Sequence, residues 1–295
     1  MVGDTPTPPA SPDQIRWRFR PEGGGALLLV AFEGWSDAGD AASTAVRYIG
    51  EQWDAEPFAD IDPELFFDFS STRPRVQLDH AHQREIVWPE NTFSVCSVPD
   101  QPLASVITLL GMEPQLRWRT FTDQILELAR ICDTQFVLTF GALLAEVPHS
   151  RPVSVFATSY DEDVVREREL VPSRYEGPTG ITGVLHTACR DAGIGSASLW
   201  AAVPTYVPAA PSPKAALALV RKAAEFTMHT VSTTELEIAS ASYERQVDDL
   251  VTDDEETREY VAQLEARFDR GTADPFNDED SLVDEVERFL REQPE

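Results

Sequence analysis

The sequence predicts an α/β fold, a three-layer α/β/α sandwich with a C-terminal acidic helical extension. Short apolar runs alternate with helical periods from Ala26 onward, and several runs are apolar on both faces, as strands covered on both sides must be. Two glycine-containing turns, at 33–40 and 175–180, each come directly before an amphipathic helix. After about residue 232 the composition changes, because residues 235–295 contain 21 acidic and 6 basic residues.

The overall charge excludes several classes of partner. The 295 residues carry 51 acidic and 24 basic side chains, a net charge of −27. Nucleic-acid binding and binding to an anionic membrane surface both need a basic face, so we expect neither. The simplest reading of the charge is solubility and mutual repulsion.

Cysteine usage and the first residues indicate a compartment. Three widely spaced cysteines, Cys96, Cys132 and Cys189, form no disulfide framework or zinc motif, which indicates a reducing environment. The first 20 residues are polar and proline-rich, unlike a signal peptide, and no run reaches the ~20 apolar residues of a spanning helix. We therefore expect a cytoplasmic protein.

The first two predicted segments are a disordered leader at 1–14 and a sandwich domain at 15–232. Apolar runs predict the strands of that domain. They lie at 26–32, 64–69, 85–89, 92–98, 105–111, 135–144, 152–158 and 196–204.

The helices between these strands follow from apolar spacings of three and four. We expect helices over 37–49 with Gly50 as the stop, over 117–132, and over 179–192 ending at Gly193. Another begins at Ser212-Pro213, with serine as N-cap and proline at the first helical position.

A helical hairpin is predicted at 233–270. Thr234 to Glu237 and Thr252 to Glu255 each match a capping box, and each is followed by apolar residues at helical spacing. Residues 271–295 form an acidic segment, read as a linker at 271–281 and a short helix at 282–290.

The first turn supplies four candidate binding residues, Glu33, Gly34, Trp35 and Asp37. A helix N-terminus with free N–H groups can bind an anion there. Alternatively, Asp37 caps the helix and Trp35 covers the sheet end. The carboxylates of Glu33, Asp37 and Asp40 disfavour a phosphate, and a cation or a basic side chain of a partner fits better. The turn matches neither the dinucleotide fingerprint nor a Walker loop.

The second turn and one loop supply the remaining candidates. In the turn these are Glu176, Gly177, Thr179 and Gly180, and Thr179 either caps the helix or presents its hydroxyl to a ligand. In the loop they are His149 and Arg151, which either bind a carboxylate or act as structural hydrogen-bonding residues.

No catalytic group can be assembled from this sequence. It shows no serine–histidine–acid or cysteine–histidine arrangement, so we predict no catalytic residues and no cofactor. His80 and His82 lie beside Asp79, but no third ligand is in view, and no metal site is predicted.

Several ordered motifs together resemble the proteasome assembly chaperone 2 family, in its bacterial branch. They cover roughly residues 15–270. The matching stretches are AFEGWSDAGDAAS, FFDFSSTRPRV, REIVWPE, LLGMEPQLRWRTF, VPHSRP, YEGPTGITGVL, SLWAAVPTYV, SPKAAL, and the tail from TELE to YVAQLEARFD. The scarcity of lysine, with only Lys214 and Lys222, fits an actinobacterial source.

The resemblance implies a sandwich like that of purine nucleoside phosphorylases. It also implies a non-enzymatic protein-binding role, with a proteasome-related protein partner and a homo-oligomeric state, a trimer or a multiple of one by analogy with phosphorylase-like folds. Some relatives dock on proteasome subunits through a hydrophobic–tyrosine–any-residue tail. This chain ends Arg291-Glu-Gln-Pro-Glu295, so docking by that route is not expected.

Two other functions stay open at this point. One is a small-molecule binder or enzyme for a nucleoside, phosphate or amine, with its ligand at the strand ends between the two turns. The other is a purely structural oligomer subunit. Whether the two turns share one pocket is not decided by the sequence.

Overall fold

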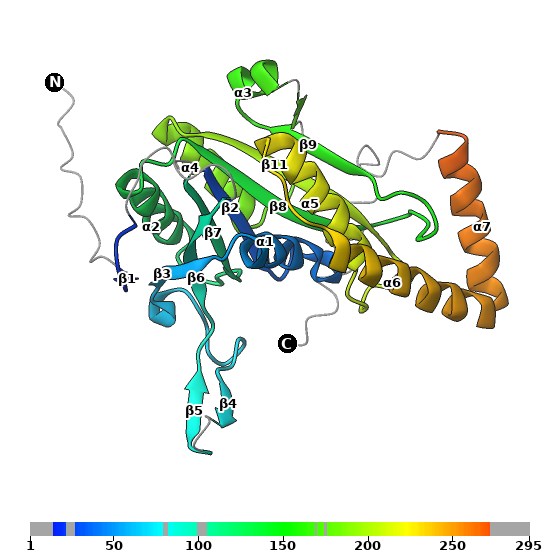
Figure 1. The fold of residues 1–295 in the computed structure, drawn as a ribbon, viewed down its shortest axis with the longest axis horizontal. Coiled ribbons are helices and arrows are strands. Elements are labelled where there is room, and N and C mark those ends of the chain that lie inside the picture. The colour runs from blue at the N-terminus through cyan, green and yellow to red at the C-terminus, as the bar shows by residue number, and fades with distance from the viewer. Residues whose placement is uncertain are drawn as a thin grey trace.

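A mixed sheet runs through the centre of the molecule (Figure 1). The structure, a computed structural model, describes residues 14–21, 27–78, 82–98, 105–168, 170–173 and 176–271. Within these ranges nine strands form the sheet, in the order β1-β3-β6-β7-β2-β8-β11-β9-β10. Their bounds are β1 (Ile15–Trp17), β2 (Leu27–Glu33), β3 (Glu56–Ile61), β6 (Asn91–Ser97), β7 (Ser105–Met112), β8 (Phe136–Ala145), β9 (Val155–Ser159), β10 (Val171–Pro172) and β11 (Gly195–Pro204).

The four central strands β7, β2, β8 and β11 are parallel to one another, so their carboxyl ends meet at one edge. Strands β1, β3 and β6 extend the sheet antiparallel on one side, and β9 pairs antiparallel with β11 on the other. Ligands and partners of open α/β sheets commonly lie at the carboxyl edge of such strands.

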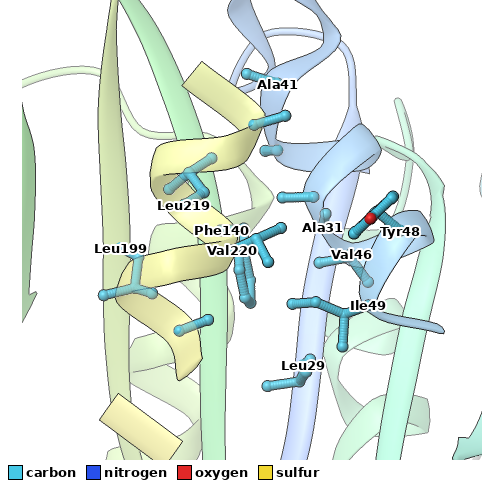
Figure 2. Packing of buried hydrophobic residues seen from close by; sticks show 14 of the residues in the cluster. Leu29, Ala31, Ala41, Val46, Tyr48, Ile49, Phe140, Leu199, Leu219 and Val220 are labelled. Carbon is cyan, nitrogen blue, oxygen red and sulfur yellow. The ribbon is translucent and has the colours of Figure 1, made fainter. Parts of the chain in front are cut away.

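Helices cover both faces of this sheet, as its apolar strands require. On β2, Leu29 and Ala31 point to the face covered by α1 (Ala41–Gln52) and α5 (Pro213–Thr227), and Figure 2 shows this packing. The alternate residues Leu28 and Val30 point to the face covered by α2 (Trp118–Ile131) and α4 (Ile181–Ala192). The predicted α/β class and its three layers are confirmed.

The remaining elements lie outside these layers. A short helix α3 (Glu162–Arg168) follows β9, and 3₁₀ turns η1 (Ala38–Asp40) and η2 (Pro63–Leu65) follow β2 and β3. Strands β4 (Arg75–Leu78) and β5 (Arg84–Val87) form a separate two-stranded sheet. Helices α6 (Thr234–Asp253) and α7 (Glu255–Asp269) extend from the end of α5 (Figure 1). Within the described ranges, no helix is long and apolar enough to span a bilayer.

The predicted strand at 64–69 is wrong. Pro63 and the side chain of Asp62, which accepts from the Glu64 N–H at 3.0 Å, start the turn η2 there instead. The aromatic residues that follow enter the core from a loop, where the Phe66 ring lies 5.2 Å from that of Phe121. The predicted strand at 85–89 is a strand at 84–87, but it belongs to the separate sheet.

Two predicted helix boundaries also need correction. Helix α1 continues past Gly50 to Gln52, because Trp53 is buried after it and its indole N–H donates to the Thr230 carbonyl at 3.2 Å. The second capping box is also misplaced. Thr252 lies inside α6, and Asp254 caps α7 by accepting from the Thr257 N–H at 2.9 Å.

The first predicted capping box is wrong, because the residue that precedes the helix is Thr233 and its side chain caps no backbone N–H. The N-cap of α6 is Thr233, whose hydroxyl donates to Glu237 Oε1 at 2.9 Å. The division of the chain into a sandwich and an appended hairpin stays a prediction, as does the likeness to phosphorylases. The leader at 1–13 and the segment at 272–295 lie outside the described residues.

Candidate functional site

The carboxyl edge of the parallel strands brings the first predicted turn next to the end of β7. Glu33 is in register with Met112, and the Glu113 N–H donates to the Glu33 carbonyl at 2.9 Å. The chain then turns at Gly34, whose φ of 127° lies where residues with a side chain are strained. Residues 33–37 and Glu113 therefore form one corner of the rim.

The second predicted turn meets this corner at Gly180. A Cβ added to Gly180 would lie 2.9 Å both from Glu113 Oε1 and from Cε3 of the Trp35 ring, so only glycine fits. The backbone N–H of Ile181, the first residue of α4, donates to Glu113 Oε1 at 2.9 Å. The two turns thus share one rim, with Glu113 between them.

Glu113 caps α4, whereas one of the two roles predicted for Thr179 was to cap this helix. The Thr179 hydroxyl donates to the Gly180 carbonyl at 3.4 Å and makes no cap. Burial raises the pKa of the Glu113 carboxyl, while hydrogen bonds from the backbone of Ile181 and Trp35 act in the opposite direction. The sequence did not predict Glu113 as a site residue, because Glu113 follows β7 and is far in the sequence from both turns.

The first turn is capped in the same way. Asp37 is buried, and its Oδ1 accepts from the N–H groups of Ala42 at 2.7 Å and Ser43 at 3.1 Å, at the start of α1. Burial raises the pKa of Asp37. Both helix N-termini at this rim are therefore occupied by carboxylates of the chain itself, and an anionic ligand would have to displace them.

The other candidates of these turns lie toward solvent. Glu33 is half-buried and forms an ion pair with Arg47 of α1, its Oε1 lying 2.9 Å from Arg47 Nη2. Glu176, Gly177 and Thr179 are exposed on the approach to α4.

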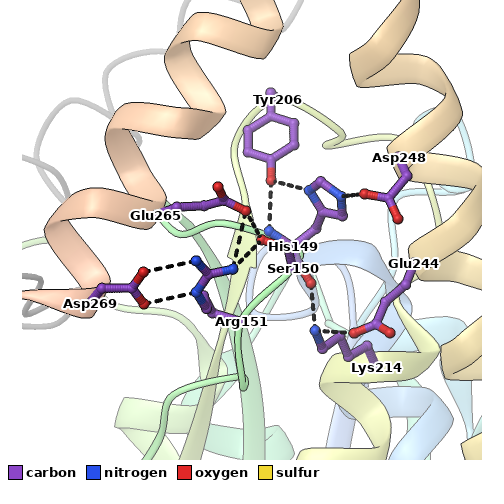
Figure 3. A network of polar contacts seen from close by, with 9 residues as sticks. All are labelled: His149, Ser150, Arg151, Tyr206, Lys214, Glu244, Asp248, Glu265 and Asp269. Carbon is purple, nitrogen blue, oxygen red and sulfur yellow. Dashed lines mark hydrogen bonds and ion pairs between the residues drawn. The ribbon is translucent and has the colours of Figure 1, made fainter.

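His149 and Arg151 belong to a different place, the loop between β8 and β9, where it meets α6 and α7 (Figure 3). His149 is buried, and its Nδ1 and its backbone N–H both lie 2.7 Å from the Tyr206 hydroxyl oxygen. Its Nε2 lies 2.9 Å from Asp248 Oδ1 on α6. The histidine therefore bridges the body of the protein to α6.

Arg151 fastens α7 to the same loop. Its Nε and Nη2 donate to the two carboxylate oxygens of Asp269, each at 2.8 Å, and its Nη1 donates to Glu265 Oε1 at 3.2 Å. The Ser150 hydroxyl also donates to Glu265. These bonds hold the guanidinium charged and raise the pKa of Arg151, and they lower the pKa of Asp269.

Further contacts complete this junction, which we call the clasp: His149, Ser150, Arg151, Tyr206 and Lys214 with their partners on α6 and α7. Lys214 of α5 binds Glu244 and the His149 carbonyl. Glu146 pairs with Arg267 at 2.7 Å. Beneath the polar contacts, Tyr243, Val247 and Val261 pack in one buried cluster with Tyr206. The contacts of the clasp support the structural interpretation of His149 and Arg151. Both residues contact the clasp and not the rim.

The described residues offer little for a metal. No group of three or more histidine, cysteine, aspartate or glutamate side chains in the described ranges is arranged to hold an ion. His80 and Asp79 lie outside those ranges, and His82 is exposed. The three cysteines are free and buried, and burial raises the pKa of Cys96 and Cys189 to about 12.

Comparison with known families identifies the chain. Residues 31–251 match the model of the PAC2 family. The chain belongs to the PAC2 family. The resemblance drawn from its motifs is thereby confirmed.

Solved PAC2 structures agree with this assignment. The chain is 41% identical to a PAC2 family protein from Streptomyces avermitilis, with 80% of this chain and 99% of that chain covered and a TM-score of 0.75. It is 40% identical to a proteasome-assembly chaperone homologue from Mycobacterium tuberculosis, with coverage of 80% and 99% and a TM-score of 0.72.

A more distant structure shares the fold alone. It is an archaeal proteasome activator from Pyrococcus furiosus, 16% identical, with coverage of 80% of this chain and 97% of that chain and a TM-score of 0.65. A comparison with proteins of curated function found no match.

Proposed function

We propose that this chain is a non-enzymatic protein-binding module with a chaperone role in proteasome assembly or a related task. One observation carries the proposal: 40% identity to a proteasome-assembly chaperone homologue, over 99% of that chain. Identity at this level usually accompanies a shared surface as well as a shared fold.

The geometry of the rim supports a protein partner over a small anion. Both helix N-termini are capped internally, by Asp37 and Glu113, so their N–H groups are not free for a phosphate. The exposed residues Glu176, Gly177 and Thr179, with the half-buried Trp35 and Glu33 beside them, present a mixed polar and aromatic surface. Such surfaces are typical of protein interfaces.

The outer side of the hairpin α6–α7 supports a basic partner. The clasp uses several of its carboxylates, but four others are exposed and have no ion pair within the described residues: Asp249, Asp253, Glu256 and Glu259. Charges of one sign steer association with an opposite surface, and salt weakens the attraction. We place the partner's basic segment on this outer side.

The proposal includes a cytoplasmic location and a homo-oligomeric state. The three free, buried cysteines fit a reducing compartment.

The test mixes the purified full chain with purified α and β subunits of an actinobacterial proteasome. We expect a complex on native gels at low salt and faster formation of the core particle. The double variant Asp249→Lys/Glu256→Lys should weaken the complex. The matched control, Glu162→Lys/Glu167→Lys, changes two exposed acids of α3 and should bind as the wild type does. Absence of a complex at low salt, with assembly unchanged, would contradict the proposal.

A further inference from the structure

The two-stranded sheet of β4 and β5, which we call the arm, projects away from the body (Figure 1). Its register pairs Val76 with Ile86 and Leu78 with Arg84. Directly opposed residues and those two apart share a face, so Val76, Leu78, Ile86 and Arg84 form one face, the apolar arm face.

The apolar arm face has no cover within the described residues. Val76, Leu78 and Ile86 are 53%, 60% and 55% exposed. An isolated two-stranded sheet is marginally stable in water, and clustered exposed apolar side chains mark interaction sites. The arm therefore needs a surface on another molecule.

A groove of suitable character lies at the foot of the arm. It has a volume of about 820 Å³ and lies between α1, the strands β6 and β7, and the first residues of the arm. Apolar side chains line part of it, among them Val46, Leu110 and Trp88. Three exposed carboxylates also line it, Glu51, Asp54 and Glu90.

The charges of arm and groove are complementary. Arg84, on the apolar arm face, is exposed and forms no ion pair with any described residue, whereas Arg73 and Arg75 line the groove itself beside its carboxylates. The three groove carboxylates likewise have no ion pair within the described ranges.

This complementarity points to a second copy of the chain. Copies with a net charge of −27 repel one another over most of their surface. Contact is favourable where an unpaired cation of one copy meets unpaired carboxylates of the other, and Arg84 of the arm face and Glu51 and Asp54 of the groove supply both.

We propose that the apolar arm face of one copy packs into the groove of a second copy, with Arg84 beside Glu51 and Asp54. This rests on the homo-oligomeric state included in the proposed function, and it names the surface that forms it. If two copies exchange arms the result is a dimer, and if each arm enters the next copy in turn the result is a ring.

The first experiment measures the mass of the full chain by sedimentation equilibrium over a range of concentrations. The wild type should weigh a multiple of 32.8 kDa. Leu78→Ser/Ile86→Ser removes two apolar contacts and should weaken self-association by more than about tenfold. The matched control, Ile238→Ser/Leu250→Ser, changes two residues of α6 that are 67% and 62% exposed, and it should keep the wild-type mass.

The second experiment tests the charge pairing. Arg84→Glu and Glu51→Arg should each weaken self-association, and an equimolar mixture of the two variants should associate more strongly than either alone. Circular dichroism spectra equal to the wild type will show that each variant is folded.

Three outcomes would overturn the proposal. They are a monomeric wild type at all concentrations, a Leu78→Ser/Ile86→Ser variant with wild-type mass, and arm variants that lose only proteasome binding, which would assign the arm to another protein. Proteasome binding is measured separately, so failure of the arm contact leaves the proposed protein-binding role standing, and only a monomeric wild type removes the homo-oligomeric state.

Discussion

The side chain of Glu113 shows how one residue organises the rim. Its Oε1 accepts a hydrogen bond from the backbone N–H of Ile181, the first residue of α4. The same oxygen lies close to Gly180, which the Trp35 ring also approaches. A helix N-terminus stabilises a negative charge, but burial penalises it, and for Glu113 burial is the larger effect because its pKa is raised. The rim therefore holds a carboxylate at some cost to stability.

We predict that Glu113→Gln keeps the fold and is at least as stable as the wild type at pH 7. A carboxyl whose pKa is higher in the folded chain binds protons more tightly when folded, so its contribution to stability falls as pH rises from the unfolded pKa through the folded pKa. Glutamine retains the Oε1 acceptor and removes this loss.

The measurement is urea unfolding of both proteins from pH 4 to pH 7. The stability of Glu113→Gln relative to the wild type should increase with pH. Glu113→Ala, which leaves the Ile181 N–H without its acceptor, should be destabilised by about 1 kcal/mol. A pH-independent difference between Glu113→Gln and the wild type would contradict the pKa shift.

At the scale of elements, the hairpin α6–α7 is joined to the sandwich in two ways: α6 packs along α5, with Leu236 in the main core, and both helices of the hairpin bind one loop. The residues 149–151 of the clasp bind both helices (Figure 3), and Val247 belongs to an apolar cluster that Tyr206 also contacts. Three acidic residues of the hairpin, Glu244, Glu265 and Asp269, are thus paired with cations of the body, whereas Asp249 and Glu256 are exposed and have no ion pair within the described residues. A segment that looks uniformly acidic in the sequence has two different sides.

We predict that Arg151→Ala loosens the hairpin without unfolding the sandwich. The substitution leaves Glu265 and Asp269 without their shared cation, so hydrogen exchange in α7 should become several-fold faster while the central strands stay protected. Arg151→Lys should restore protection only in part, because lysine cannot make the two-pronged contact with Asp269.

Arg258→Ala is the control for this experiment. Arg258 pairs with Glu255 inside α7 and does not reach the body, so exchange at the clasp should be unchanged. Equal exchange in wild type and Arg151→Ala would show that the other contacts of the hairpin hold α7 without Arg151.

For the whole molecule, the response to acid depends on His186, a buried histidine of α4 whose side chain contacts the sheet. His186 Nε2 lies 2.9 Å from the Thr139 hydroxyl, and its Nδ1 lies 2.8 Å from the Ser196 hydroxyl. All three side chains are buried, Nε2 also lies 2.6 Å from the Ser198 hydroxyl oxygen, and the partners of the imidazole among the described residues are thus hydroxyl groups. Burial lowers the pKa of His186 to about 4.

We predict that this histidine makes the fold acid-sensitive. Because its pKa is lower in the folded chain, the unfolded chain takes up a proton first, and the free energy of unfolding falls as pH drops from about 6.5 to about 4. The full loss is on the order of 3 kcal/mol.

Thermal unfolding measured from pH 7 to pH 4 will show whether this holds. His186→Gln should be less stable at pH 7 but less dependent on pH in this window. His229, whose pKa burial also lowers, acts in the same direction and is present in both proteins. His82→Gln changes an exposed histidine and should follow the wild type.

Whether an element can be predicted from the sequence depends on how close in the sequence the residues that stabilise it are. Apolar periodicity located α2, α4 and the long central strands, because their pattern alone requires burial on a given face, and the capping residues Ser212 and Pro213 located the start of α5. It missed β3, where Pro57 and a bulge interrupt the pattern, and the short edge strands β1 and β10. The apolar residues at 64–69 predicted a strand, but they form the end of the turn η2 and the loop after it. Apolar composition does not distinguish a buried strand from a buried loop.

The sequence by itself determined the α/β class, the order of most helices and strands, and, through its motifs, the family. Local spacing and capping chemistry decide these features. Only the tertiary structure decided that Glu113 joins the two turns, that His149 and Arg151 serve the hairpin, and that β4 and β5 form an exposed arm. Those contacts join residues far apart in the chain, and chain folding, not local pattern, sets which of them meet.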